Sequence, residues 1–231
     1  MNKYRKIFID CGANMGTGFS KLCDQIGVDH TWEVFAFEPN EYAFDGYVEN
    51  IKSEKFSCLN DKNINVFQKA VWIEDGEIQF CMEGLNEDEY TKNELWRQEC
   101  DKHVKKYPLE SLELGVPSCG GSCIKEMHDK LERGEDHEKL FQWSDPVFVE
   151  CIDFSKWIKE NFSKDDYIFL KMDIEGSEYK ILPKMIEDNT IQYINDLAIE
   201  WHDWVMPEFK SETSSLSNQL SSLGINLLSW G

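Results

Sequence analysis

The chain has 231 residues, of which 41% are hydrophobic and 29% charged, and its aromatic residues include 8 Trp. This composition is typical of a folded globular domain and excludes a disordered or low-complexity chain. With 44 acidic and 24 basic residues, the formal net charge is −20, which disfavours nucleic acid and anionic membranes as partners. We find no apolar stretch of the roughly 20 residues that span a bilayer and no signal peptide. A soluble, cytoplasmic protein is therefore expected.

Short apolar runs alternate along the chain with amphipathic stretches. The apolar runs predict strands over 6–10, 34–38, 65–71, 168–173 and 196–201. The amphipathic stretches predict helices over 17–26, 40–52, 154–162 and 177–188. Helical crossovers of this length connect parallel neighbours. The order therefore indicates a single α/β, Rossmann-like domain over 1–231, with a mostly parallel twisted sheet and helices on both faces.

A long insertion, at about 81–146, separates strands predicted over 76–80 and 147–151. Helical patterning over 93–107 and 124–133 predicts a helical lid that covers the substrate. The segment between these helices carries Cys119 and Cys123 in the sequence SCGGSC. Because no second pair of ligands follows, a glycine loop is favoured there over a zinc site. Whether 225–231 completes an antiparallel hairpin stays open.

The strongest local motif is IDCGANMGTGF over 9–19, where a predicted strand ends at an acid and turns through glycines into a helix. Its glycine spacing does not match the nicotinamide or phosphate-loop fingerprints. The motif resembles instead the first motif of S-adenosylmethionine-dependent methyltransferases. In that interpretation Asp10 faces the methionine ammonium, while Gly12 and Gly16 allow close approach of the backbone. The alternative is a tight turn without a ligand.

Glu38 ends the second predicted strand, 22 residues after Gly16. An acid at this position can accept hydrogen bonds from both ribose hydroxyls of a nucleoside. The alternative is a surface glutamate in front of a turn proline, Pro39. The position of Glu38 supports a nucleoside-containing cofactor independently of the glycine motif.

Six motifs occur in the order FIDCGANMG, FAFEPN, QKAVW, CIDFSKWI, LKMDIEGSEYKIL and LAIEWH. Over roughly 6–80 and 147–205, this series resembles the FkbM-type methyltransferase family, and the run DIEGSE is its most specific part. The resemblance implies a class I methyltransferase fold and O-methylation, often on a sugar or glycan. The residues that it assigns to S-adenosylmethionine are Asp10, Gly12, Asn14, Gly16, Glu38 and, near the adenine, Ala70.

Methylation of an alcohol requires that its oxygen be aligned with the methyl group and relieved of its proton. His202, after the last predicted strand, is a candidate base or metal ligand, the alternative being a hydrogen-bonded rim histidine. Asp173, at the tip of the fourth predicted strand, could orient the acceptor, hold a metal or act as the base. Asp173, Glu200 and His202 together form a candidate ligand set for Mg²⁺ or Mn²⁺.

Two further features each have two interpretations. Lys171 is expected in a structural ion pair rather than in catalysis. Trp201 and Trp204 would offer flat apolar faces to a sugar, or they would pack in the core. Three functions remain open: a methyltransferase for sugar hydroxyls, an O-methyltransferase for another small molecule, and a non-catalytic module that binds the cofactor. The sequence sets neither the acceptor hydroxyl nor the oligomeric state.

Overall fold

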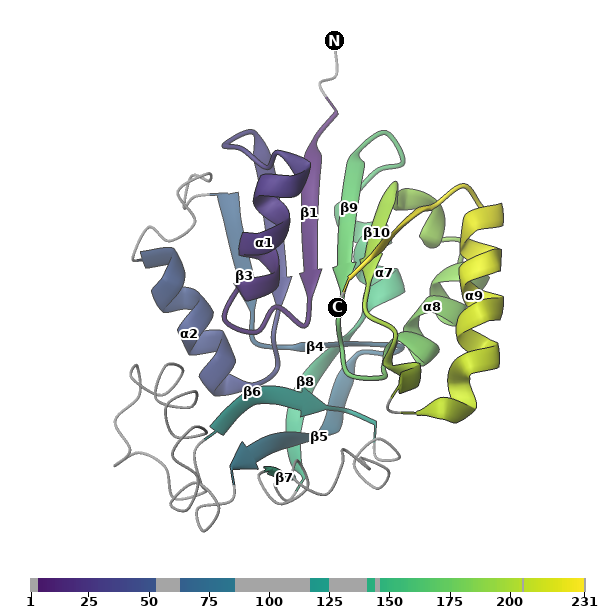
Figure 1. Cartoon of the computed structure of the whole chain (residues 1–231). Coiled ribbons are helices and arrows are strands. Elements are labelled where there is room, and N and C mark those ends of the chain that lie inside the picture. The colour runs from purple at the N-terminus through teal and green to yellow at the C-terminus, as the bar shows by residue number, and fades with distance from the viewer. Residues whose placement is uncertain are drawn as a thin grey trace.

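A parallel sheet forms the centre of the computed structural model, which describes residues 4–52, 63–85, 117–124, 141–143, 146–204 and 206–230 (Figure 1). Its strands are β1 (Lys6–Cys11), β2 (Trp32–Phe37), β3 (Ile64–Phe67), β9 (Tyr167–Met172), β10 (Asp196–Ile199) and β11 (Asn226–Ser229). They lie in the order β11-β10-β9-β1-β2-β3, and each pair of neighbours is parallel. The expected α/β fold with a parallel sheet is confirmed.

Helices cover both faces of this sheet, because its central strands are apolar on both sides. In β1, Ile7 and Ile9 join one core cluster and Phe8 joins the other. The Phe8 face packs against α1 (Thr17–Ile26), with α2 (Glu41–Lys52) beside it. The helices on the opposite face are α7 (Phe154–Asn161), α8 (Glu178–Glu187) and α9 (Lys210–Ser222).

A second, mixed sheet lies across the carboxyl ends of the parallel strands, as the arrowheads of β1 and β9 in Figure 1 show. Its strands are β4 (Ala70–Trp72), β5 (Gly76–Leu85), β6 (Pro117–Ser122), β7 (Phe141–Trp143) and β8 (Val147–Asp153). The order is β4-β8-β5-β6, and β7 also pairs with β5. Short 3-10 helices occupy Ile191–Tyr193 (η3), His202–Trp204 (η4) and Pro207–Phe209 (η5).

The single strand expected over 65–71 is wrong. The chain forms β3 in the parallel sheet and then β4 in the second sheet, with a break between them. The break arises because Ala70 and Val71 find their partners in β8, where Ala70 pairs with Cys151. This pairing joins residues distant in sequence, so the local apolar pattern does not reveal it.

The glycine loop expected around Cys119 is also wrong, because Pro117–Ser122 forms strand β6 and pairs antiparallel with β5. A Cβ atom at Gly121 would lie 2.2 Å from the Phe80 ring, so a glycine is needed for the two strands to pack here. The described parts of the insertion form strands of the second sheet and not helices. The predicted lid helices lie outside the described residues, except for the non-helical Ile124.

The last described strand, β11, pairs in parallel with β10 and forms the edge of the sheet. The segment after residue 225 is therefore a parallel edge strand rather than part of an antiparallel hairpin. None of the helices in the described parts of the chain is both long and apolar enough to cross a membrane.

Candidate active site

The turn between β1 and α1 is shaped by glycines with left-handed backbone conformations, Gly12 at φ +73° and Gly16 at φ +84°. The amides of Gly12 and Ala13 donate to the carbonyl oxygen of Phe37, at 3.1 and 3.0 Å, which ties the turn to β2. A Cβ atom at Gly12 would lie 1.7 Å from the carbonyl oxygen of Asp173. Only glycine therefore lets this turn pass so close to the end of β9.

Glu38 follows β2 directly and is buried. Its Oε2 atom accepts a hydrogen bond from the Asn14 amide at 2.7 Å, and its Oε1 atom accepts one from the Asn40 amide at 2.8 Å. Each carboxylate oxygen has a second lone pair with which it can accept another hydrogen bond. Burial raises the pKa of Glu38 to about 7, although the two amides favour the charged form. Its charge therefore changes near neutral pH.

A first cavity, with about 610 Å³ of empty volume, lies between the two sheets. It is lined by Gly12, Asn14, Glu38 and Asp173, which follow the parallel strands, and by Ala70, Phe80 and Gly121 of the second sheet with Cys123 just after β6. The structure thus brings four of the predicted cofactor residues, Gly12, Asn14, Glu38 and Ala70, to one cavity. Gly16 lies at the start of α1 and shapes the turn instead.

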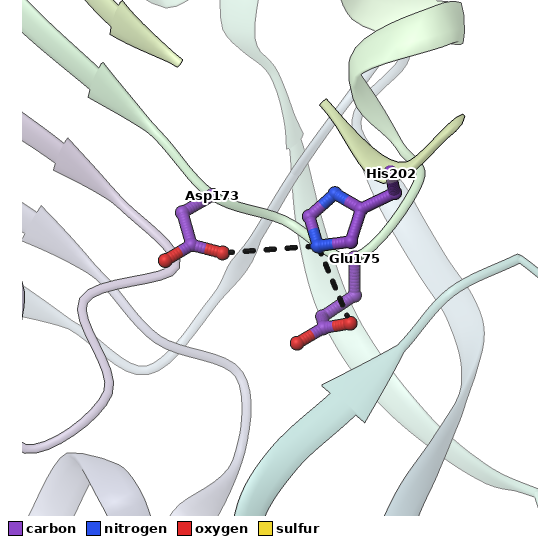
Figure 2. Close-up of side chains that lie close together, drawn as sticks. All are labelled: Asp173, Glu175 and His202. Atoms are coloured by element: carbon purple, nitrogen blue, oxygen red, sulfur yellow. Dashed lines mark ion pairs between the residues drawn. The ribbon is translucent and has the colours of Figure 1, made fainter. Parts of the chain in front are cut away.

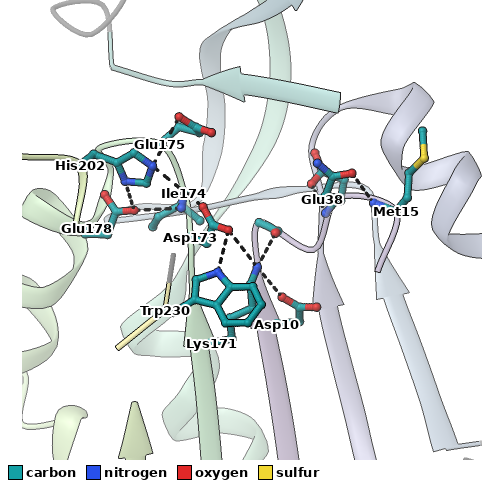
Figure 3. Close-up of polar contacts among 12 residues, drawn as sticks. Asp10, Met15, Glu38, Lys171, Asp173, Ile174, Glu175, Glu178, His202 and Trp230 are labelled. Atoms are coloured by element: carbon teal, nitrogen blue, oxygen red, sulfur yellow. Dashed lines mark hydrogen bonds and ion pairs between the residues drawn. The ribbon is translucent and has the colours of Figure 1, made fainter. Parts of the chain in front are cut away.

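Asp10 is fully buried and pairs with Lys171, whose Nζ atom lies 3.1 Å from Asp10 Oδ1 (Figure 3). The same Nζ donates to the Gly12 carbonyl oxygen at 2.8 Å and lies 3.5 Å from Asp173 Oδ2. Burial acts to lower the pKa of Lys171, but Asp10 and Asp173 raise it overall. The expected ion pair of Lys171 is confirmed. Asp10 is not among the described residues that line either cavity, and its predicted contact with the methionine ammonium stays a prediction.

Asp173 follows β9 and lies between the first cavity and a second one, which has about 940 Å³ of empty volume. The second cavity is also lined by Lys21, Lys171, Glu200 and Trp230. The indole Nε1 of Trp230 donates to Asp173 Oδ2 at 3.1 Å. Trp230 and Lys171 therefore fix the orientation of the Asp173 carboxylate, whose side chain is 24% exposed.

His202 begins η4 and is 1% exposed. Its Nδ1 atom lies 3.0 Å from Glu178 Oε1, which also accepts from the Ile174 amide at 2.9 Å. Its Nε2 atom faces Glu175 Oε2 at 3.5 Å and Asp173 Oδ1 at 4.0 Å (Figure 2). Burial lowers the pKa of His202, but these carboxylates raise it to about 10. His202 is not among the described residues that line either cavity. Of the two carboxylates that its Nε2 atom faces, Glu175 lines the first cavity and Asp173 lines both.

Asp173, Glu175 and His202 each offer one ligand atom, and these three atoms all lie within 4.8 Å of one another, so the group could hold a metal ion. The set predicted from the sequence contains Glu200 where this group contains Glu175, and it stays a prediction. Glu175 has a left-handed φ of +53° in the turn after β9, and its side chain faces His202. Glu200 lines the second cavity instead, and burial together with Asp173 raises its pKa.

Sequence reasoning missed several residues of the site. Glu175 was visible as an acid two positions after Asp173 in a glycine turn, a pattern that places two carboxylates close together. Trp230 and the lining residues Phe80 and Gly121 carried no local signal, because their positions follow from the pairing of β11 and of the second sheet.

The chain is similar to a solved protein structure and to a protein-family model. The chain resembles the crystal structure of methyltransferase FkbM from Methylobacillus flagellatus KT with a TM-score of 0.47 and 13% identity over 95% of its length. It spans 37% of that protein. A search of curated proteins gave no match. The profile of the methyltransferase FkbM domain matches residues 10–224. The chain therefore belongs to the FkbM methyltransferase family.

Proposed function

We propose that the protein is an S-adenosylmethionine-dependent O-methyltransferase that acts on a hydroxyl group of a sugar or glycan. The observation that carries this proposal is the buried Glu38 carboxylate, which lines one cavity together with the glycine turn and Asp173. A buried carboxylate needs hydrogen-bond donors, and the hydroxyls of a ribose are suitable donors. Membership of a methyltransferase family supplies the reaction class.

The residues that line the first cavity offer groups that suit S-adenosylmethionine. Glu38 would accept hydrogen bonds from the ribose hydroxyls, and the backbone of Gly12 and Asn14 would face the remainder of the molecule. Ala70 is buried on the second sheet and would lie near the adenine. When bound, S-adenosylmethionine supplies an electrophilic methyl group on its sulfonium. Asp10 acts indirectly, because it pairs with the Lys171 ammonium that holds the Gly12 carbonyl.

Asp173 is the catalytic residue in this proposal. Its carboxylate reaches both cavities, so it would accept the proton of the acceptor hydroxyl or align that hydroxyl. Trp230 and Lys171 hold the carboxylate in one orientation, which favours a productive geometry. His202 has no described contact with either cavity, so it would act through Asp173 as a positioning residue.

The acceptor would occupy the second cavity. Trp230, Glu200 and Asp173 line it, and a neighbouring groove shares Glu200 and Trp230 and adds Trp201 and Trp204. Trp204 is 58% exposed, so its indole does not serve core packing alone. A sugar ring presents C–H groups that suit indole faces and hydroxyls that suit carboxylates. These features favour a sugar over an apolar acceptor.

Replacing Glu38 with alanine is expected to weaken binding of S-adenosylhomocysteine by roughly 5- to 150-fold, because hydrogen bonds to the ribose are worth about 1–3 kcal/mol. Isothermal titration calorimetry measures this change. The control variant is Glu41→Ala, since Glu41 is an exposed acid in the first turn of α2. Equal affinity of the folded Glu38 variant and the wild type would contradict the assignment of the ribose site.

The affinity for S-adenosylhomocysteine is expected to rise with pH. The ribose hydroxyls donate to the ionised form of Glu38, and its pKa of about 7 leaves most of the carboxyl protonated at pH 6. Between pH 6 and pH 8 the ionised fraction, and with it the affinity, should increase about tenfold. Glu38→Gln removes this titration, so the difference between the two profiles isolates Glu38 from the titration of the ligand. If the affinities of the wild type and of Glu38→Gln change equally with pH, the prediction is contradicted.

A further inference from the structure

The cluster of Asp173, Glu175 and His202 has a spacing that direct hydrogen bonds do not explain. The Nε2 atom lies 3.5 Å from Glu175 Oε2 and 4.0 Å from Asp173 Oδ1. Charge-assisted hydrogen bonds are shorter, at about 2.7–2.9 Å. Two ligands at about 2.1 Å from a shared ion lie about 3.0 Å apart at right angles and about 3.4 Å apart at the tetrahedral angle. The three ligand atoms, which all lie within 4.8 Å of one another, would have to move closer together to share one ion.

Glu178 orients the His202 imidazole so that its Nε2 atom faces Asp173 and Glu175. It is fully buried, and its Oε1 atom lies 3.0 Å from His202 Nδ1. An ionised carboxylate can only accept, so Nδ1 carries the hydrogen, and in the neutral imidazole Nε2 then carries the lone pair. The Nε2 atom faces Asp173 and Glu175 (Figure 3). Because the pKa of His202 is about 10, Nε2 carries a hydrogen in the metal-free protein, and a bound ion would displace this proton to solvent. A carboxylate, an imidazole and a metal in this order are a common arrangement in metal sites.

The local charge also favours a cation. Asp173, Glu175 and Glu178 lie around the single imidazole, and Glu200 interacts with Asp173 from the other side. Lys171 also lies close to Asp173, but it is shared with Asp10. The described residues around His202 thus carry more negative than positive charge, and a divalent ion would reduce this excess.

We propose that Asp173, Glu175 and the Nε2 atom of His202 bind a divalent metal ion of the Mn²⁺ type. One imidazole nitrogen and carboxylate oxygens form a donor set that suits Mn²⁺. Since Asp173 and Glu175 also line the first cavity, the ion lies at its edge. Its role, which rests on the proposed function, is to bind the acceptor hydroxyl and lower its pKa. Binding of the ion itself does not depend on that function.

The test uses wild-type protein treated with EDTA and titrated with MnCl₂, without cofactor or acceptor. Free Mn²⁺ is measured by electron paramagnetic resonance, and we expect one bound ion per chain. Pulsed resonance should detect coupling to one imidazole nitrogen in the wild type and none in His202→Gln. Glu175→Gln should weaken binding by at least about tenfold. The control Glu77→Gln changes an exposed acid on β5 and should bind like the wild type.

Weak binding without a defined stoichiometry would overturn the proposal, as would binding that Glu175→Gln and His202→Gln leave unchanged. If His202→Gln fails to fold, Glu175→Gln decides the outcome, because the Glu175 side chain is 27% exposed and tolerates replacement more readily. Calorimetry with S-adenosylhomocysteine on the same samples separates the two claims. Cofactor binding without Mn²⁺ binding contradicts only the metal site, and Mn²⁺ binding without cofactor binding contradicts only the proposed function.

Discussion

Replacing Asp173 with asparagine is expected to lower kcat by about 10²–10⁴-fold, the usual contribution of general base assistance. The amide keeps the size of the side chain but loses the charge and the ability to accept a proton. Asp173 is the described carboxylate that reaches both cavities, and it stands next to Lys171 and Trp230 (Figure 3). Steady-state kinetics measures kcat, and calorimetry with S-adenosylhomocysteine measures whether cofactor binding survives.

The matched control is Asp203→Asn, which removes a neighbouring carboxylate in η4 that does not belong to the proposed metal site. This variant should keep kcat within a few-fold of the wild type, because substitutions away from the core and the site usually have small effects. If Asp173→Asn retains near-normal kcat while it folds and binds the cofactor, Asp173 is neither the base nor the group that orients the acceptor.

Replacing His202 with alanine is expected to lower kcat by about 10²–10⁴-fold while the affinity for S-adenosylhomocysteine changes little. The imidazole lies behind Asp173 and Glu175 and outside the described lining of the first cavity, so it affects the reaction through them. The side chain is buried, and its loss also removes a partner of Glu178. Thermal unfolding of the variant therefore has to accompany the kinetics.

His202→Gln provides a second test that preserves more of the side-chain volume. If the residue holds the proposed ion, Mn²⁺ should stimulate the wild type after EDTA treatment and stimulate this variant only at higher concentrations. Should chelation leave the wild-type rate intact, the ion has no part in the reaction, and Asp173 would act as the base directly. Near-normal kcat in both His202 variants would contradict its role as a positioning residue.

Much of the fold could be predicted because its signals are local. The continuous apolar runs of β1 and β9 follow from burial on both faces of a parallel sheet. The helix expected over 17–26 matches α1, because the glycine turn before it and Gly27 after it mark both ends. Glu38 was predictable for the same reason, since it directly follows a strand whose end is clear from the pattern.

The remaining features depend on contacts between distant segments. Asp10 and Lys171 are register partners in β1 and β9, and only this pairing shows that the carboxylate meets an ammonium of the chain itself. Similarly, Gly121 is part of a strand because β6 pairs with β5 next to Phe80. Whether Glu175 or Glu200 lies beside His202 depends on how the turn after β9 meets η4, and the spacing along the sequence does not determine this.

Transfer of an isotope-labelled methyl group from S-adenosylmethionine to a panel of glycans tests the central claim most directly. We expect that wild-type protein labels at least one glycan, that the label resides in a methyl ether on a sugar oxygen, and that Asp173→Asn gives about 10²–10⁴-fold less product. Mass spectrometry of the permethylated and hydrolysed product locates the label. Label on nitrogen or carbon, or no transfer to any glycan by protein that binds S-adenosylhomocysteine, would contradict the account.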